Sequence, residues 1–126
     1  MGLRFSLIPG AFAIVKLPPD AAMPRWATNG EFCSVTRTAH ELSIVCLQEN
    51  VLADTKADTG WICLKLHGPF AFSETGILAS FIGPLSSSGI PIFAISTFDT
   101  DYVLIKQEFA GAAFEALGQA GHEWIA

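Results

Sequence analysis

The chain has 126 residues, of which 51% are hydrophobic and 15% charged, and its formal net charge is −5 at pH 7. This apolar content can offset the entropy lost on folding, so we expect one compact domain or two very small modules sharing a core. The negative charge disfavours nucleic acids and anionic membrane surfaces as partners, because their phosphate groups would repel it. No apolar stretch reaches the roughly 20 residues that a membrane-spanning helix needs.

The N-terminal half is dominated by predicted strands. Nearly continuous apolar residues from Leu3 to Leu17 predict two strands separated by a turn at Pro9-Gly10. FCSVTRT (residues 32–38) and ELSIVCLQ (residues 41–48) predict a β-hairpin. VLADTKADTG (residues 51–60) is typical of a loop or linker.

The C-terminal half alternates strand and helix patterns in the order βαββαβ. The segments are WICLKLHG (61–68), ILASFIGPLSSSG (77–89), IPIFAISTF (90–98), DYVLIKQE (101–108), FAGAAFEALGQ (109–119) and HEWIA (122–126). This order predicts an α+β, ferredoxin-like fold with both helices on one face of an antiparallel sheet. RNA-binding sheets share the order, but they need a basic surround that this acidic chain lacks.

A weak internal repeat links the two halves. Residues 34–49 can be laid over residues 94–108 with one extra residue in the first hairpin, and Glu41 then falls on Asp101. Both segments end in Gln-Glu. The repeat predicts duplication of one small unit whose first copy has lost or shortened its helices.

The cysteines and histidines form no recognisable catalytic or metal-binding pattern. Three cysteines lie in apolar, strand-like segments without a CxxC motif: Cys33, Cys46 and Cys63. Buried reduced thiols, and hence a cytoplasmic location, are expected. His40, His67 and His122 lack metal-ligand spacing, and solvent exposure accounts for His40 and His122. We therefore expect no catalytic residue, metal or cofactor; only His67, beside a Gly-Pro loop, would support a small enzyme.

An acidic corner is the best candidate for a ligand site. The FDTD turn (residues 98–101) should lie beside HGPFAFSETG (residues 67–76), which leads into the first helix. Backbone N–H groups at a helix start can bind a carboxylate, while Asp99 or Asp101, with Glu74, can hold an ammonium or guanidinium group. A zwitterionic amino acid would satisfy both. The alternative is structural, because Asp is common in turns and Glu at helix starts.

Several motifs in this region resemble the ACT domains of the family that includes the cytosolic arginine sensors of animals and many small bacterial proteins. The resemblance covers ETGILASFIGPLSSSGIPIFAISTFDTDYVLIKQE, residues 74–108. Its carriers are Gly76-Ile77, Gly83-Pro84-Leu85, Ile95-Ser96-Thr97-Phe98 and Asp101. The segment FCSVTRTAHELSIV is similar to the partner segment of the same family.

The resemblance implies tandem ACT-type modules, a reduced one over residues 1–60 and a complete one over residues 61–126. ACT domains generally bind small ligands, mostly amino acids, at the interface between two modules, and so act as non-enzymatic sensors that regulate an enzyme or protein partner. Matching positions here assign ligand contacts to Glu74, Gly76, Ile92, Thr97, Phe98 and Asp101. Because the chain holds only one tandem pair, a homodimer is expected. The alternative is an ACT-type interaction or dimerisation module without a ligand.

Overall fold

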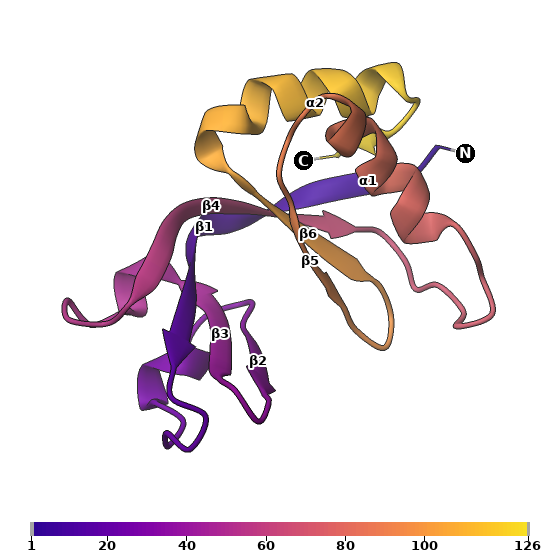
Figure 1. Ribbon diagram of the computed structural model, residues 1–126. Helices are drawn as coiled ribbons and strands as arrows, with labels where there is room; N and C mark the ends of the chain where they lie inside the picture. Colours follow the sequence, from indigo (N-terminus) through magenta and orange to yellow (C-terminus); the bar gives the residue numbers. More distant parts are fainter. Residues whose placement is uncertain (1, 126) are drawn as a thin grey trace. The chain divides into compact units, whose positions relative to one another are not determined.

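The computed structural model describes residues 2–125 and divides them into two compact units. The C-terminal unit contains residues 2–8 and 62–125, and the N-terminal unit is Pro9–Trp61. The elements are β1 (Arg4–Leu17), η1 (Arg25–Thr28), β2 (Ser34–Arg37), β3 (Leu42–Leu47), η2 (Gln48–Asn50), β4 (Ala57–Leu66), α1 (Ile77–Ser87), β5 (Phe93–Ser96), β6 (Asp101–Lys106), η3 (Gln107–Phe109), α2 (Ala110–Gln119) and β7 (Glu123–Trp124), as labelled in Figure 1. Within residues 2–125, no helix is long and apolar enough to cross a membrane. The predicted module boundary at residues 60 and 61 remains a prediction.

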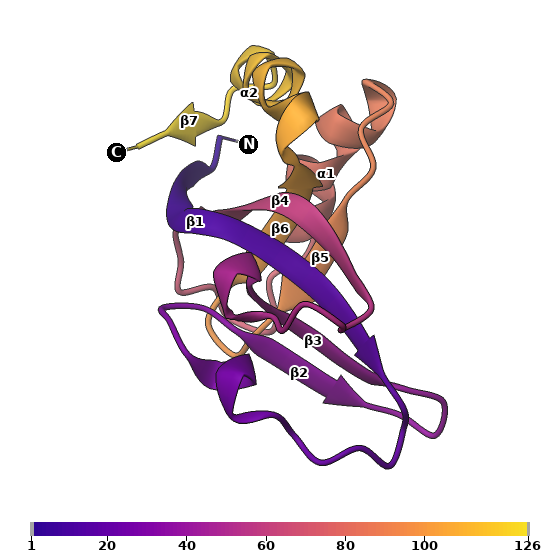
Figure 2. The same cartoon turned by 90° about the vertical axis from the view of Figure 1, so that its left-hand side faces the viewer.

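In the C-terminal unit, both helices lie on one face of a sheet with the strand order β7-β1-β4-β6-β5 (Figures 1 and 2). β5 and β6 pair antiparallel, from Phe93↔Leu104 to Ser96↔Asp101. This confirms the predicted ferredoxin-like arrangement. The first residues of β1 complete it: they lie between β4 and β7, and Arg4 and Phe5 pair with β7 in parallel.

The core of this unit lies between the helices and the sheet. In α1 the buried residues Ile77, Phe81 and Leu85 recur every four positions, which places them on one face of the helix. Phe81 packs edge-on against Phe5 of β1, with ring centroids 5.3 Å apart. The other buried members are Leu3, Leu64, Leu66, Ile90, Val103, Ile105, Ala113 and Leu117.

The N-terminal unit contains the predicted hairpin, formed by β2 and β3, and short 3₁₀ helices. β3 pairs antiparallel with β1, from Phe12↔Leu47 to Leu17↔Leu42, and with β2 on its other side. The buried residues Ala13, Val15, Ala27, Leu42, Ile44 and Cys46 form its small core. None of the three cysteines forms a disulfide; Cys46 and Cys63 are buried as predicted, whereas Cys33 is partly exposed.

Two predictions about strand ends were wrong. Pro9-Gly10 is not a turn, because β1 continues through both residues without a break. The boundary between the two units falls within this strand, between Ile8 and Pro9. Gly10 has φ +102°, and a Cβ on it would lie 2.7 Å from Cδ2 of Leu47, so glycine fits this step. The last four residues of the predicted loop or linker over residues 51–60 belong to β4, which begins at Ala57. Pairing with β1, which is distant in the sequence, outweighs the polar composition of this segment.

The hairpins β2–β3 and β5–β6 have the same construction. In each, a four-residue strand and a six-residue strand flank a four-residue turn, and a 3₁₀ helix follows. Thr38 N donates to Glu41 O at 2.9 Å, and Thr97 N donates to Thr100 O at 2.8 Å. The two turns therefore correspond without an inserted residue, and the extra residue that the sequence alignment placed in the first hairpin is not there.

His122 is buried, which corrects the expectation that solvent exposure accounts for it; His40 is exposed as expected. Nδ1 of His122 accepts the N–H of Leu3 at 3.1 Å, and Nε2 of His122 lies 2.9 Å from the carbonyl oxygen of Ser80. These partners require a neutral ring with the proton on Nε2. The side chain thus joins the start of the chain to α1.

We expect His122→Ala to lower the free energy of unfolding by about 1–3 kcal/mol, because it leaves a buried N–H and a carbonyl without partners. Chemical denaturation measures this change. The control His40→Ala removes an exposed imidazole and should stay within about 0.5 kcal/mol of the parent. Equal denaturation midpoints for parent and His122→Ala would contradict the proposed structural role.

Candidate ligand-binding site

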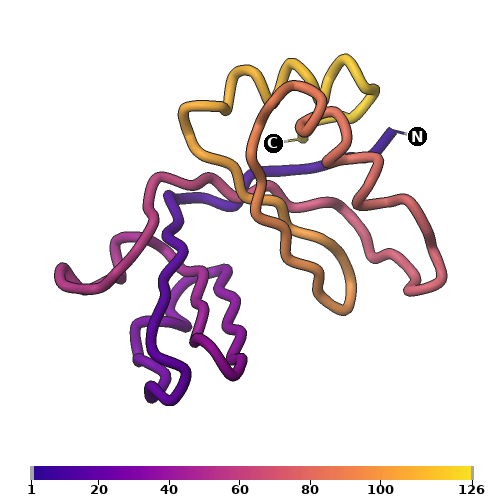
Figure 3. The backbone as a smooth tube through the Cα atoms, viewed as in Figure 1, coloured from indigo at the N-terminus to yellow at the C-terminus, as the bar shows by residue number. Residues whose placement is uncertain are grey.

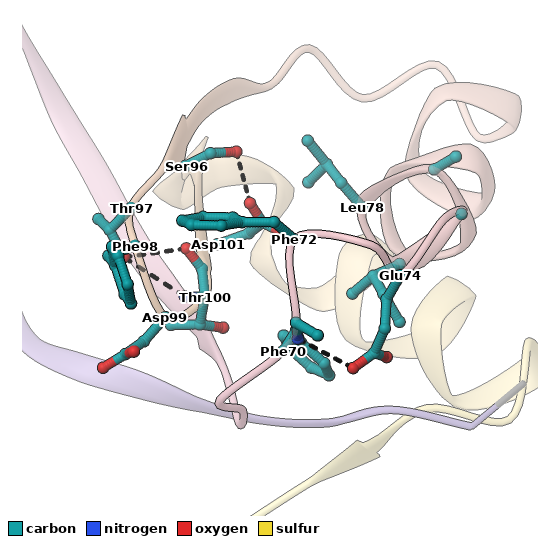
Figure 4. Close-up of a pocket in the computed structure, with 14 residues that line it drawn as sticks. Phe70, Phe72, Glu74, Leu78, Ser96, Thr97, Phe98, Asp99, Thr100 and Asp101 are labelled. Atoms are coloured by element: carbon teal, nitrogen blue, oxygen red, sulfur yellow. Dashed lines mark hydrogen bonds between the residues drawn. The ribbon is translucent and has the colours of Figure 1, made fainter.

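A pocket of about 340 Å³ lies in the C-terminal unit, where three segments meet. They are the loop after β4, the first turn of α1 and the β5–β6 turn, all of which can be followed in Figure 3 and seen closely in Figure 4. The sequence predicted that the FDTD turn would lie beside the loop leading into the helix. The structure confirms that juxtaposition.

The β5–β6 turn is tied to the end of β4 and to the loop that follows. The hydroxyl of Thr100 donates to Leu66 O at 2.7 Å, and Phe70 N donates to Asp99 O at 2.8 Å. Within the turn, the Thr97 hydroxyl also donates to Thr100 O, at 3.0 Å. A Cβ on Gly68 would lie 2.9 Å from both Asp99 O and Phe70 N, so only glycine allows this close approach.

The start of α1 presents backbone donors to the pocket. Its N-cap, Gly76, has φ +77°, and no side chain caps the helix. The residues of the first turn, Ile77 to Ala79, line the pocket. Glu74 instead folds back on its own loop, where its Oε1 accepts the N–H of Ala71 at 3.0 Å. The uncapped first turn is therefore available to an anionic group.

Carboxylates dominate the charged groups of the pocket. Its lining includes Glu74, Asp99 and Asp101 but no lysine, arginine or histidine among the described residues. Asp101 is partly buried, and its Oδ1 accepts a hydrogen bond from the Ser96 hydroxyl. In Figure 4 the Asp99 carboxylate points away from that of Asp101. The Asp101 carboxylate and the first turn of α1 thus line the same pocket.

Two large aromatic side chains stand exposed at this pocket. Phe72 and Phe98 are 76% and 77% exposed, although their rings touch at a centroid distance of 4.8 Å and an interplanar angle of 75°. Exposed apolar side chains that gather in one place are characteristic of binding surfaces. The sequence analysis gave Phe72 no role, because a single phenylalanine in a loop carries no periodic signal.

The predicted site residues are largely brought together. Glu74, Gly76, Thr97, Phe98 and Asp101 all line the pocket. Ile92 does not: it precedes β5 and packs against the core of the unit. Whether each of the six contacts a ligand remains a prediction.

The β2–β3 hairpin of the N-terminal unit has no carboxylate at the position equivalent to Asp101. Strand register makes Leu42, which is almost fully buried, the counterpart of Asp101, and Arg37 the counterpart of Ser96. The Arg37 guanidinium is held by the carbonyl oxygens of Pro19 and Ala21. Only the C-terminal hairpin therefore combines a hydroxyl and a carboxylate at this position.

His67, the residue that would support an enzyme, lies at a second pocket of about 260 Å³ with Lys65, Asp99 and Tyr102. Its Nε2 is 2.9 Å from the hydroxyl of Ser6. Among residues 2–125, no group of three or more His, Cys, Asp or Glu side chains could hold a metal ion.

Comparison with known proteins identifies the fold family. The sequence-family model for the ACT domain matches residues 56–119, just over half of the chain. The chain belongs to the ACT-domain family. A second family model, for a domain described as N-terminal, matches residues 10–54, within the N-terminal unit.

The proteins similar to this ACT-domain protein include an arginine sensor in sequence and, in fold alone, a regulatory subunit. The cytosolic arginine sensor for mTORC1 subunit 1 of Homo sapiens is 36% identical over 58 residues, which are 45% of this chain and 18% of the sensor. The chain therefore matches less than a fifth of that relative. A crystal structure from Agrobacterium tumefaciens is 43% identical, with a TM-score of 0.94, covering 99% of this chain and 93% of the other. The regulatory subunit of aspartate kinase from Thermus flavus is 16% identical, covers 95% of this chain and 97% of that subunit, and shares the fold with a TM-score of 0.60.

We expect Gly68→Ala to destabilise the protein by about 1–3 kcal/mol, because the added methyl group would push the loop away from the β5–β6 turn. Hydrogen exchange should show faster exchange at the Phe70 amide. The control Gly118→Ala adds a methyl group to α2 with nothing within 4 Å, and should leave stability unchanged or raise it by up to about 1 kcal/mol. Unchanged protection at Phe70 in Gly68→Ala would contradict the tie between turn and loop.

Proposed function

We propose that this chain is a non-enzymatic regulatory sensor that binds a cationic or zwitterionic amino acid in the pocket at the β5–β6 turn. One observation carries the proposal: the pocket combines carboxylates, without a lining cation, and an uncapped helix start. An α-amino acid carries the two complementary charges. Catalytic chemistry has no comparable support in this pocket, which is lined by neither a histidine nor a cysteine among the described residues.

In this proposal the ligand carboxylate lies at the first turn of α1, where backbone N–H groups and the positive end of the helix dipole favour an anion. The ligand ammonium, or a cationic side chain, pairs with Asp101. The Ser96 hydroxyl holds that carboxylate in place by donating to Oδ1. Thr97 and Phe98 contribute backbone atoms, and Glu74 adds negative charge at the rim.

The relatives support a regulatory role of this kind. The human protein that shares the matched segment is named a cytosolic arginine sensor, and a regulatory subunit of aspartate kinase shares the fold. By the same reasoning we place this protein in the cytoplasm, where ligand occupancy would control an enzyme or protein partner. The acidic pocket keeps arginine among the candidate ligands, together with other amino acids.

We further propose that the site is completed by a second copy of the chain. Phe72 and Phe98 form an exposed apolar rim, and a partner that covered them would remove that surface from water. An interface containing this rim would also shield the charges of a bound amino acid from solvent, which strengthens their pairing. The same rim favours the second candidate function, an interaction module that dimerises without a ligand.

A thermal-shift screen against the twenty amino acids tests the sensor function. A ligand at 100 times its Kd should add about 2.7 kcal/mol of stability, and so raise Tm by several degrees. Asp101→Asn should lose this ligand-induced shift, because breaking a desolvated charge pair costs about 2–5 kcal/mol of binding. Asp99→Asn is the matched control, since it removes a carboxylate in the same turn that points away from Asp101. A flat screen, or equal shifts in parent and Asp101→Asn, would contradict the sensor or its site.

We expect Phe98→Ser to weaken dimerisation by about 2 kcal/mol, or roughly thirtyfold in Kd, as for a central aromatic interface residue. Analytical ultracentrifugation over a concentration series measures this change. Phe93→Ser is unsuitable as a control because that side chain is partly buried. Leu52→Ser serves instead, because it removes an exposed apolar side chain from the N-terminal unit, away from the pocket. A parent chain that stays monomeric at every concentration would exclude the dimer, whereas a dimer with a flat amino-acid screen would favour the interaction module.

A further inference from the structure

Two cysteines of the N-terminal unit stand opposite each other across the β2–β3 hairpin. The register pairs Ser34, the first residue of β2, with Val45; continued by one residue beyond the strand, it sets Cys33 opposite Cys46. Directly opposed residues of an antiparallel pair share a face of the sheet and have Cα atoms about 4.5–5.5 Å apart. That spacing falls inside the roughly 4.4–6.8 Å that disulfide bonds span.

The two thiols differ in their access to solvent. Cys46 is completely buried in the core of the unit, whereas Cys33, just before β2, is partly exposed. Burial raises the pKa of Cys46 to about 11, and a negative charge on the neighbouring Cys33 contributes to the increase. This electrostatic coupling is a second sign that the two sulfur atoms are neighbours. A reagent in solution can therefore reach the Cys33 thiol but not the Cys46 thiol.

We propose that Cys33 and Cys46 form a modification site, at which a low-molecular-weight disulfide such as glutathione disulfide closes an intramolecular bond between β2 and β3. The proposal is independent of the amino-acid function. It uses residues of the N-terminal unit only, while the candidate ligand pocket lies in the C-terminal unit.

The reaction proceeds in two thiol–disulfide exchanges. The Cys33 thiolate attacks one sulfur of glutathione disulfide, forms a mixed disulfide and releases one glutathione thiolate. The Cys46 thiolate then attacks the Cys33 sulfur, forms the Cys33–Cys46 bond and releases the second glutathione. Two protein thiols thereby lose two electrons and two protons, and glutathione disulfide is reduced to two glutathione molecules that take up those protons.

The pKa of Cys46 sets the rate of the second exchange. Because burial raises this pKa, the side chain is almost entirely a neutral thiol at pH 7, and its thiolate fraction grows about tenfold for each pH unit until the pKa is reached. Capping Cys33 removes its charge, but the burial of Cys46, which is the larger cause, remains. The mixed disulfide on Cys33 should therefore accumulate at neutral pH and close faster in alkali.

The test uses the full chain, incubated with glutathione disulfide at about pH 7 and pH 9 and quenched with acid. Intact mass and peptide mapping should show one glutathionyl group on Cys33 first, then a Cys33–Cys46 bond whose formation from the mixed disulfide accelerates about tenfold per pH unit. Cys63 is fully buried in the C-terminal unit and serves as the internal control, which should stay unmodified in the folded chain.

Two variants separate the steps. Cys33→Ser should take up no glutathione at either pH, and Cys46→Ala should keep the glutathionyl group on Cys33 without closing a bond. The proposal is overturned if Cys33→Ser oxidises as fast as the parent, or if the parent keeps Cys33 glutathionylated at pH 9 without forming the bond. Because Cys33 is partly exposed, its replacement keeps the test decisive even if Cys46→Ala does not fold.

Discussion

Two hydrogen bonds that hold the β5–β6 turn against the end of β4 and the loop after it are the constraint on which the candidate site depends. They run from the Thr100 hydroxyl to Leu66 O and from Phe70 N to Asp99 O. Each contributes only about 1 kcal/mol net to stability, but breaking the bond of Thr100, which is buried, would leave a buried polar group without this partner at greater cost. With the turn fixed in this way, Asp101 and the first turn of α1 face the same pocket. A carboxylate and a set of backbone donors so placed can recognise opposite charges of one small molecule.

The two hairpins share one construction but differ in the residues at the position of the proposed ligand site. Both turns have the same backbone hydrogen bond between their first and last residues. At the position of Asp101, however, the N-terminal hairpin has the buried Leu42, and at the position of Ser96 it has Arg37, which binds main-chain carbonyls. The difference concentrates the proposed amino-acid site in the C-terminal unit. The N-terminal unit instead places Cys33 opposite Cys46.

Local patterns were sufficient to predict most elements and the neighbourhood of the site. The four-residue spacing of Ile77, Phe81 and Leu85 predicted α1. Of the six residues that the resemblance to ACT domains assigned to the ligand, five line one pocket. Long-range pairing was not predictable, because nothing in the segment 3–17 shows that its first residues lie beside β4 and β7. Burial of the polar His122 was missed for the same reason: its partners, Leu3 and Ser80, are far away in sequence.

The most direct measurement is a map of backbone amide shifts in the full chain during titration with pools of the twenty amino acids. The account predicts saturable shifts from at least one pool, largest at residues 71–79 and 96–101, with no comparable change at residues 34–47. Saturable shifts confined to other residues would mean that the pocket at the β5–β6 turn is not the ligand site. The absence of any saturable shift would contradict the amino-acid sensor itself.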